Sequence, residues 1–297
     1  MNAPAYASGR LTVHTEPDRL TEVSTALRAA GRKVALVPTM GALHAGHVEL
    51  IRHARRAPGA TITAVSIFVN PLQFGPGEDL DSYPRTMQSD LEVCQKEGVE
   101  LVFAPNADAM YADSTGIAVH PGPLGAELEG ASRPGHFAGV LTVVAKLFGI
   151  VRPQLAYFGE KDYQQQVLVR RMARELDLGV EVIAVPTVRE PDGLALSSRN
   201  VYLSEDERGR AMALSAALAA GRHAAPEGAD AVLDAARATL AAASGVDVDY
   251  LALRDPELGP APERGPARLL VAAKVGSTRL IDNCPLTLGA EPPVRRT

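Results

Sequence analysis

The fold of this chain is decided by one stretch, Val34-Ala35-Leu36-Val37-Pro38-Thr39-Met40-Gly41-Ala42-Leu43-His44-Ala45-Gly46-His47. Its apolar first half is typical of a buried parallel strand, and its two glycines let the backbone approach a ligand closely. A helix that begins near Gly46 turns its free N–H groups toward the preceding turn, where they favour an anion. The stretch therefore predicts a strand, a phosphate-binding turn and a helix.

Two histidines mark the entrance of that helix. His44 and His47 lie three residues apart, so both imidazoles can point to one side, toward a phosphate at the helix N-terminus. The spacing alone also fits part of a zinc site or two ordinary surface histidines. Zinc needs three or four ligands, and no further cysteine or histidine lies at ligand spacing nearby. We therefore favour phosphate binding over zinc.

Length and composition set bounds on the class of protein. The chain has 297 residues, enough for two domains. Its formal net charge is -5 and its 30 Lys and Arg are scattered, so we expect no nucleic-acid partner and no membrane patch. No apolar run approaches a membrane span, and the N-terminus lacks the apolar core of a signal peptide. Cys94 and Cys284 are the only cysteines, which fits a cytoplasmic, reducing environment.

Strand and helix patterns alternate over the first two thirds of the chain. Besides the strand of the deciding stretch, strands are expected at 61–69, 100–104, 154–158 and 180–185, and helices at 18–30, 46–56, 85–98, 137–150 and 162–174. Residues 128–133 are expected to form a loop. The alternation predicts an α/β domain on a parallel sheet, with right-handed crossovers.

A stretch rich in Pro, Gly and charged residues, 186–193, has the composition of a linker, so we place a domain boundary between residues 187 and 188. Beyond it, helices are expected at 205–225 and 229–242, and strands at 246–253, 268–275 and 278–283. Helices followed by strands predict a smaller α+β domain.

Four further motifs follow the first in order. They are Phe68-Val69-Asn70-Pro71-Leu72-Gln73-Phe74, Arg133-Pro134-Gly135-His136-Phe137, Phe158-Gly159-Glu160-Lys161-Asp162-Tyr163-Gln164-Gln165 and Ser197-Ser198-Arg199-Asn200. Together with Pro38 to His47, they resemble the motifs of the pantoate-beta-alanine ligase (pantothenate synthetase) family, which carries the HIGH-type signature of adenylate-forming nucleotidyltransferases. Ala45 departs from the family pattern, which usually has Glu there.

The resemblance implies a fold and an activity. Residues 1–187 would form a Rossmann-like nucleotidyltransferase domain that binds ATP and pantoate, and residues 188–297 a lid domain. The activity would be ATP-dependent condensation of pantoate with β-alanine through a pantoyl adenylate, releasing AMP and pyrophosphate. Mg²⁺ would accompany ATP, and the chain would form a homodimer.

The resemblance also implies site residues, which fall into three overlapping groups. Catalytic roles would belong to His44, His47, Lys161 and Arg199. ATP would be bound by Pro38, Thr39, Met40, Gly41, His47, Gly159, Lys161, Asp162, Val188, Ser197, Ser198 and Arg199. Substrate would be bound by Met40, Asn70, Gln73, Arg133 and Gln165, with Arg133 near the site and toward a partner subunit.

Some of these positions have their own support. Asn70 and Gln73 follow a predicted strand at its carboxyl end, where open α/β sheets bind ligands, although Asn also favours ordinary turns. Lys161 lies at a second strand-to-helix connection. Attack on the α-phosphorus of ATP builds charge on phosphate oxygens, so cations and hydrogen-bond donors are the residue types that this chemistry needs.

Other functions remain open on the residues alone. Ser197 and Ser198 fit a plain serine-rich turn, and a hydrolase is disfavoured because no G-x-S-x-G elbow surrounds them. A related adenylating ligase would differ in its acceptor at Asn70, Gln73 and Gln165. A nucleotide-binding regulatory protein without turnover is the third alternative, and the presence of both a lysine and an arginine at the phosphate positions argues against it.

Overall fold

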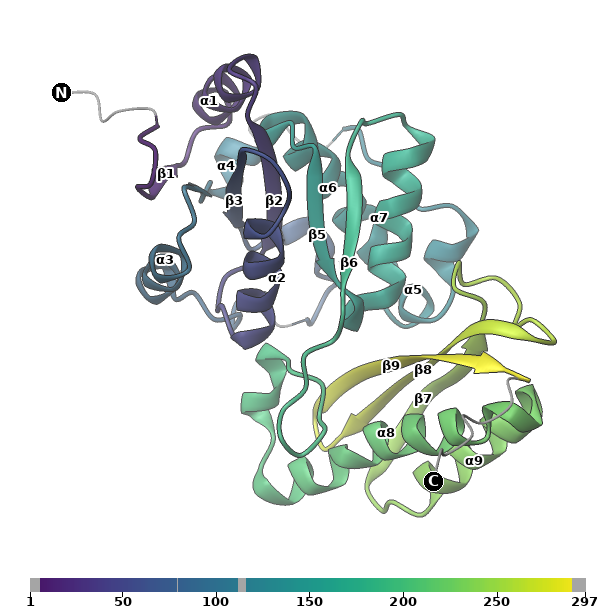
Figure 1. Cartoon of the computed structure of the whole chain (residues 1–297). Coiled ribbons are helices and arrows are strands. Elements are labelled where there is room, and N and C mark those ends of the chain that lie inside the picture. The colour runs from purple at the N-terminus through teal and green to yellow at the C-terminus, as the bar shows by residue number, and fades with distance from the viewer. Residues whose placement is uncertain (1–5, 79, 112–115, 290–297) are drawn as a thin grey trace, which may run out of the picture. The chain divides into compact units, whose positions relative to one another are not determined.

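The apolar run of the deciding stretch forms β2 (Lys33–Thr39), at the centre of a six-stranded parallel sheet (Figure 1). The structure is a computed structural model and describes residues 6–78, 80–111 and 116–289 of the chain. β3 and β5 pair with β2 on its two sides, and residues Val34 to Val37 are fully buried beneath helices that pack against the strand. A strand covered on both faces needs no apolar–polar alternation, which explains its continuous apolar sequence.

The sheet contains β1 (Thr12–His14), β2, β3 (Thr61–Ile67), β4 (Leu101–Phe103), β5 (Leu155–Gly159) and β6 (Glu181–Val185). Its spatial order is β1-β4-β3-β2-β5-β6, and every neighbouring pair is parallel. From β2 the chain crosses to β3 on one side, and it later returns to β5 on the other. Thr39 and Gly159, the carboxyl ends of β2 and β5, therefore border the topological switch point, where α/β sheets bind ligands.

Helices cover this sheet and supply its core. They are α1 (Pro17–Ala29), α2 (Ala45–Arg55), α3 (Met87–Lys96), α4 (Ala107–Met110), α5 (Glu129–Ser132), α6 (His136–Val151) and α7 (Tyr163–Glu175). Ile51 of α2 and Cys94 of α3 share one buried cluster with Val37 and Val65 of the sheet. Helices α1 and α6 pack against each other and against β2.

The remaining chain forms α8 (Glu205–His223), α9 (Ala229–Ala241), β7 (Val246–Arg254), β8 (Gly265–Val275) and β9 (Thr278–Leu288). The three strands make an antiparallel sheet in the order β7-β8-β9. Leu214 and Leu218 of α8 and Val232 of α9 pack with Leu269 and Val271 of β8 in one core. This arrangement confirms the predicted fold class, a Rossmann-like α/β sheet with a smaller α+β part.

Two local predictions differ from the structure, and strand β1 was not predicted. The expected loop at 128–133 contains the one-turn helix α5, and the edge strand β1 is too short to produce a recognisable pattern. Strand β9 continues to Leu288, past the expected end at 283. The prediction stopped before Pro285, but β9 lies at a sheet edge, where a residue without an N–H is tolerated.

Contacts divide the chain into two compact units. The first unit comprises Met1–Gly159 and Gln165–Pro186, and the second comprises Glu160–Gln164 and Thr187–Thr297. The second unit therefore takes a short segment from the middle of the chain as well as the C-terminal part. Nothing in the linker composition at 186–193 indicated that segment.

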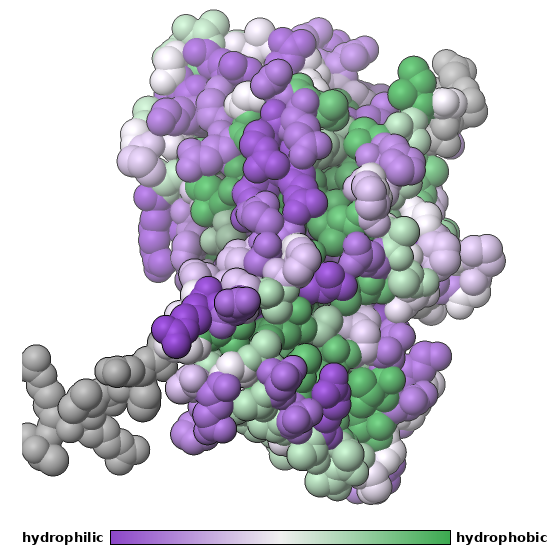
Figure 2. All heavy atoms as spheres, turned by 90° about the vertical axis from the view of Figure 1, so that its right-hand side faces the viewer, coloured by the Kyte–Doolittle hydropathy of each residue, from purple (hydrophilic) through white to green (hydrophobic). Residues whose placement is uncertain are grey.

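One face of the molecule carries both polar and apolar residues (Figure 2). Figure 2 shows hydrophilic residues spread over the drawn face, with hydrophobic residues in small groups between them. Within the described part of the chain, no helix is both long and apolar enough to cross a membrane.

Candidate active site

We call Met40–His47, which follows β2, the first turn. Gly41 and Ala42 both have φ in the left-handed region, at 87° and 50°, so the chain reverses direction sharply. Thr39 fixes the start of the reversal, because its hydroxyl donates to the Ser66 carbonyl at 2.7 Å and accepts from the Gly41 N–H at 3.2 Å. The turn is thus held by specific contacts in a backbone conformation that alanine seldom adopts.

Asp90 of α3 fastens the first turn. Its carboxylate accepts the backbone N–H groups of Ala42 at 3.1 Å and Leu43 at 2.8 Å, and the hydroxyl of Thr86 at 3.2 Å. Asp90 is only 2% exposed, and a Cβ on Gly41 would lie 2.9 Å from its Oδ2. Hydrogen bonds to a carboxylate are stronger than neutral ones, so Asp90 offsets the strain of the left-handed residues.

The two histidines cap α2 and orient each other. His44 Nδ1 accepts from the Gly46 N–H at 3.1 Å, and His47 Nδ1 accepts from the His44 N–H at 3.3 Å. Their ring centroids lie 4.1 Å apart. Because both Nδ1 atoms accept, the hydrogen-bond network assigns the ring proton to Nε2 in each imidazole. The pair therefore offers two neutral N–H donors beside the N-terminus of a helix.

Asn70, directly after β3, organises the short helix η1 (Pro71–Gln73). Its amide nitrogen donates to Gln73 Oε1 and to the Gly139 carbonyl, both at 3.2 Å. Its oxygen accepts from the Leu72 N–H at 3.2 Å and from the Tyr111 hydroxyl at 2.8 Å. Burial raises the pKa of Tyr111 to about 12, which keeps the hydroxyl protonated. Asn70 is 1% exposed, and its side chain holds Gln73 through the hydrogen bond to Gln73 Oε1.

Gln73 connects η1 with the first turn. Its side-chain amide donates to Met40 Sδ at 3.0 Å. Its backbone carbonyl accepts from His136 Nδ1 at 2.8 Å and from Arg133 Nη2 at 3.4 Å. Three of the predicted substrate residues, Met40, Asn70 and Gln73, therefore lie together.

Gly139 of α6 makes that position of η1 possible. A Cβ on Gly139 would lie 2.1 Å from the Leu72 carbonyl oxygen and 2.7 Å from the Gln73 nitrogen. Both are backbone atoms and cannot swing aside. Glycine at 139 is thus required by the close approach of α6 to the segment that carries Gln73.

Arg133 is held by an ion pair inside its own chain. Its Nε donates to Glu78 Oε1 at 2.9 Å, its Nη2 donates to Glu78 Oε2, and its Nη1 lies 3.0 Å from His136 Nε2. Burial acts to raise the pKa of Glu78, but the hydrogen bonds and charge of Arg133 outweigh burial and lower it. In this conformation Arg133 ties residue 78 to the backbone of Gln73.

In the second unit, ion pairs anchor the loop that carries Ser197, Ser198 and Arg199. Arg189 donates to both carboxylate oxygens of Asp282 on β9, at 2.6 and 2.9 Å. Arg208 of α8 donates to Glu190 and Asp192. Ser197 Oγ accepts from the Arg199 N–H at 3.2 Å and so begins η4 (Ser198–Tyr202). The residues that precede the serines, 189–192, are therefore fixed to β9 and α8.

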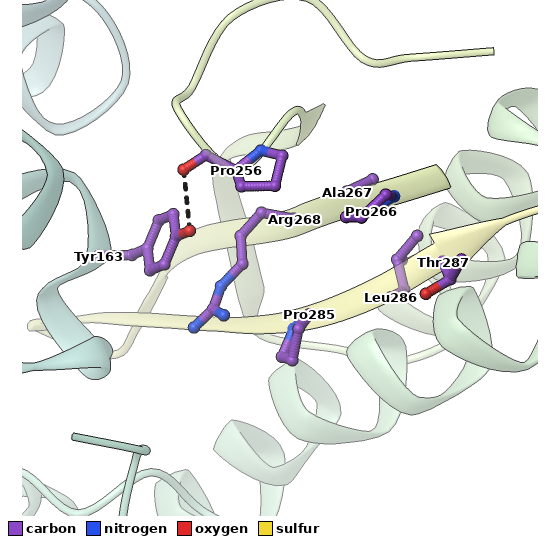
Figure 3. A pocket seen from close by; sticks show the side chains of 8 residues that line it. All are labelled: Tyr163, Pro256, Pro266, Ala267, Arg268, Pro285, Leu286 and Thr287. Carbon is purple, nitrogen blue, oxygen red and sulfur yellow. Dashed lines mark hydrogen bonds between the residues drawn. The ribbon is translucent and has the colours of Figure 1, made fainter. Parts of the chain in front are cut away.

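We call Glu160–Gln164, which follows β5, the second turn. Lys161 Nζ lies 3.6 Å from Asp162 Oδ1, and the Tyr163 hydroxyl donates to the Pro256 carbonyl at 2.9 Å. Tyr163 and Arg268 line a hollow of about 390 Å³ in the second unit, together with several prolines of the same unit (Figure 3). This turn is supported by residues that lie far away in the sequence.

The predicted residues thus divide between the units. The first unit holds Pro38, Thr39, Met40, Gly41, His44, His47, Asn70, Gln73, Arg133, Gly159 and Gln165. The second unit holds Lys161, Asp162, Val188, Ser197, Ser198 and Arg199. Within the second unit, the Val188 carbonyl accepts from the Leu196 N–H at 2.9 Å, so Val188 lies beside the residue that precedes Ser197.

The described residues contain no group of three or more His, Cys, Asp or Glu that could hold a metal ion. Cys94 and Cys284 are buried thiols, and burial raises the pKa of Cys94 to about 12.

Comparison with known proteins identifies the family of this chain. The family model described as pantoate-beta-alanine ligase matches residues 12–285. The chain belongs to this family. It is 68% identical over 286 residues to the pantothenate synthetase of Saccharopolyspora erythraea, a match that covers 96% of this chain and 94% of that protein.

Solved structures of pantoate-beta-alanine ligases share the fold. The pantothenate synthetase of Thermus thermophilus aligns with a TM-score of 0.85 at 48% identity and covers 92% of this chain and 99% of its own. The enzyme of Francisella tularensis, complexed with beta-gamma ATP and beta-alanine, aligns with a TM-score of 0.77 at 32% identity. That match covers 95% of this chain and 99% of the other. Family membership makes this chain a ligase.

The sequence did not reveal several residues that support the site. Asp90 lies within a predicted helix, and Gly139 lies within another, so neither pattern distinguishes it from its neighbours. Arg268 offered a signal that was missed, because a charged residue stands there directly before the apolar run 269–273 of a predicted strand. Polar residues in buried strands usually have a specific partner.

Proposed function

We propose that this chain joins pantoate to β-alanine in two steps at the expense of ATP. In the first step a pantoate carboxylate oxygen attacks the α-phosphorus of ATP, and pyrophosphate leaves. In the second step the β-alanine amine attacks the acyl carbon of pantoyl adenylate, and AMP leaves. Family membership supports the reaction, and the observation that carries the mechanism is the pair of Nε2–H donors of His44 and His47 beside the α2 N-terminus.

Charge develops on phosphate oxygens during the first step, so fixed donors and cations accelerate it. We assign His44 and His47 as neutral donors to phosphate, and Lys161 and Arg199 as cations. The hydroxyls of Ser197 and Ser198 would donate to the same group. Nucleotide contacts from Pro38, Thr39, Met40, Gly41, Gly159, Asp162 and Val188 complete the proposed ATP site.

Pantoate is proposed to contact Gln73, Gln165 and Met40. Neutral amides can donate to its oxygens without an ion pair that would weaken the carboxylate as a nucleophile. Asn70 and Arg133 would act through Gln73, since one holds its side chain and the other its carbonyl. Gln73→Ala and Gln165→Ala should each weaken pantoate binding by about 0.5–3 kcal/mol and leave ATP affinity intact. Loss of ATP affinity with unchanged pantoate affinity would place the pocket elsewhere.

Mg²⁺ is proposed to enter with the nucleotide. Asp162 offers a half-exposed carboxylate beside Lys161, and Mg²⁺ is commonly held by one or two carboxylates together with substrate phosphates. A single carboxylate fits a Mg²⁺ ion that is held mainly by the phosphates of ATP, and the charge of that ion would neutralise the phosphates. Measuring ATP binding to the wild type and to Asp162→Asn with and without Mg²⁺ tests this. Equal dependence on Mg²⁺ in both proteins would remove Asp162 from the assignment.

Two proposals concern assembly and motion. We propose a homodimer, on the family resemblance, and a monomer mass by light scattering at micromolar concentration would reject it. We also propose that the second unit acts as a lid that brings Ser197, Ser198 and Arg199 to the phosphates. The radius of gyration measured by small-angle scattering should then decrease when ATP and pantoate are added, and identical profiles would contradict the lid.

A cytoplasmic location is proposed because both cysteines are free thiols.

An isotope experiment tests the reaction itself. Pantoate labelled with ¹⁸O in its carboxylate should transfer one label to AMP, and ATP–pyrophosphate exchange should require pantoate but not β-alanine. Exchange with another carboxylic acid and none with pantoate would indicate a related adenylating ligase. Nucleotide binding without exchange for any acid would indicate a regulatory protein.

A further inference from the structure

Several polar residues are buried in the second unit's sheet, and two of them, Arg268 and Asn283, contact the second turn. Arg268 of β8 is 4% exposed and Asn283 of β9 is 3% exposed. Their neighbours Leu269 and Cys284 belong to the core formed with α8 and α9. Because successive side chains alternate between faces of a sheet, Arg268 and Asn283 point to the opposite face.

On that opposite face, the two residues contact the second turn. Asn283 Nδ2 donates to the backbone carbonyls of Glu160 at 2.9 Å and Lys161 at 3.0 Å. Asn283 Oδ1 accepts from Arg268 Nε at 2.7 Å. Arginine only donates, so this contact fixes which end of the Asn283 amide is oxygen and which is nitrogen.

Arg268 contacts the same turn, and we call the pair of Arg268 and Asn283 the clamp. Its Nη2 donates to Glu160 Oε2 at 2.9 Å, and its guanidinium carbon lies 3.9 Å from the centroid of the Tyr163 ring. Figure 3 shows the Arg268 side chain beside Tyr163, whose hydroxyl is bound to the Pro256 carbonyl. The residues on both sides of Lys161 are therefore held by the sheet.

We propose that Arg268 and Asn283 are positioning residues for Lys161, and this inference rests on the proposed role of Lys161 in adenylation. A buried ion pair adds little stability over an apolar replacement, so its better explanation is the geometry it fixes. Lysine has a long flexible side chain, so a fixed backbone narrows the positions that the Lys161 ammonium group can reach. Displacement of a reacting group by about 1 Å can lower a rate by about a hundredfold.

Two variants of Asn283 test the proposal through kinetics. Asn283→Ala removes both donors to the turn, and Asn283→Asp keeps the acceptor for Arg268 but turns an oxygen toward the two carbonyls. Each should lower the rate of pantoate-dependent ATP–pyrophosphate exchange by about tenfold to a hundredfold, with the pantoate KM within about twofold of wild type. The control is Arg279→Ala, which removes the Arg279–Asp249 ion pair from the same strand. Its rate should stay near wild type.

A double variant separates positioning from general damage. If Asn283 acts through Lys161, then adding Asn283→Ala to Lys161→Ala should cause no further loss of rate, because coupled residues are not additive. Independent, multiplied losses would overturn the proposal. Arg268→Lys serves as a second test in case Asn283→Ala does not fold. It keeps a charge for Glu160 but loses the planar contact with Tyr163, so it should lower the exchange rate by less than Asn283→Ala, again without changing the pantoate KM.

Hydrogen exchange of the full chain without ligands gives a readout independent of activity. Asn283→Ala should speed exchange of the amides at 160–164 and leave those at 40–47 unchanged. If the variant shows this faster exchange while the wild-type chain has no pantoate-dependent activity, the proposed function is rejected and the clamp is confirmed. Unchanged exchange at 160–164 would reject the clamp whatever the activity.

Discussion

The first and second turns occupy equivalent places in the fold but are supported in different ways. Each follows a central strand of the parallel sheet and leads into a helix. The first turn is fastened within its own part of the chain, by Asp90 and by the mutual caps of His44 and His47. The second turn is fastened by Arg268 and Asn283 of the antiparallel sheet. Equivalent places in a fold can therefore depend on local or on distant parts of the chain.

The largest expected effect tests whether the second turn carries an essential group. Lys161→Ala should lower pantoate-dependent ATP–pyrophosphate exchange by about 10²- to 10³-fold, because one fixed donor to a charged transition state is lost. The free energy of unfolding should change by less than about 0.5 kcal/mol, as for other partly exposed positions. Lys274→Ala, at an exposed site on β8, is the control. A near wild-type rate in Lys161→Ala would show that the second turn carries no essential catalytic group.

A second variant tests whether the first turn is supported separately. Asp90→Asn replaces one acceptor oxygen by an NH₂ group, so the side chain can accept only one of the two N–H groups of Ala42 and Leu43. The free energy of unfolding should fall by about 1–3 kcal/mol, and hydrogen exchange should quicken at 40–47 but not at 160–164. Glu92→Gln, exposed on the same helix, should change neither. Equal loosening of both turns would contradict their separate support.

A third variant sharpens the comparison inside the first unit. Gly139→Ala should displace η1 and raise the pantoate KM without changing the ATP KM, with a loss of stability of about 1–3 kcal/mol from overpacking. Gly149→Ala on the same helix is a matched control, since its Cβ would meet nothing within 4 Å. That control should leave stability unchanged or raise it by about 0.5–1 kcal/mol. If both variants behave alike, the contact with Leu72 does not position Gln73.

The smallest effect concerns the ion pair behind Gln73. Because the pKa of Glu78 is lowered in the folded protein, its ion pair stabilises the fold above the unfolded pKa of about 4.5, and this stabilisation is lost as the pH falls below that value. The pair is partly exposed, so the contribution should be at most about 1 kcal/mol. Urea unfolding of wild type and Glu78→Gln should differ at about pH 7 and converge near pH 3. A difference that persists at the lower pH would assign the effect to packing.

The two turns also show what a sequence can predict. The first turn was predictable because its glycines and histidines stand close together and follow a recognisable strand. Its support by Asp90 was not, since an acidic residue in a helix is usually solvated. The partners of the second turn lie much further along the chain, at separations of 108 and 123 residues. No periodicity or local motif connects residues so far apart.

The membership of Glu160–Gln164 in the second unit has a consequence for cutting the chain. A fragment that begins at Thr187 would contain Arg268 without Glu160 and Tyr163, and Asn283 without the carbonyls it serves. An unpaired buried charge is destabilising by about 3–5 kcal/mol, a large part of the stability of a small domain. The linker at Pro186 is therefore not a point at which the protein separates into two self-sufficient halves. A peptide spanning residues 158–166, added in trans, is the piece that the C-terminal fragment would lack.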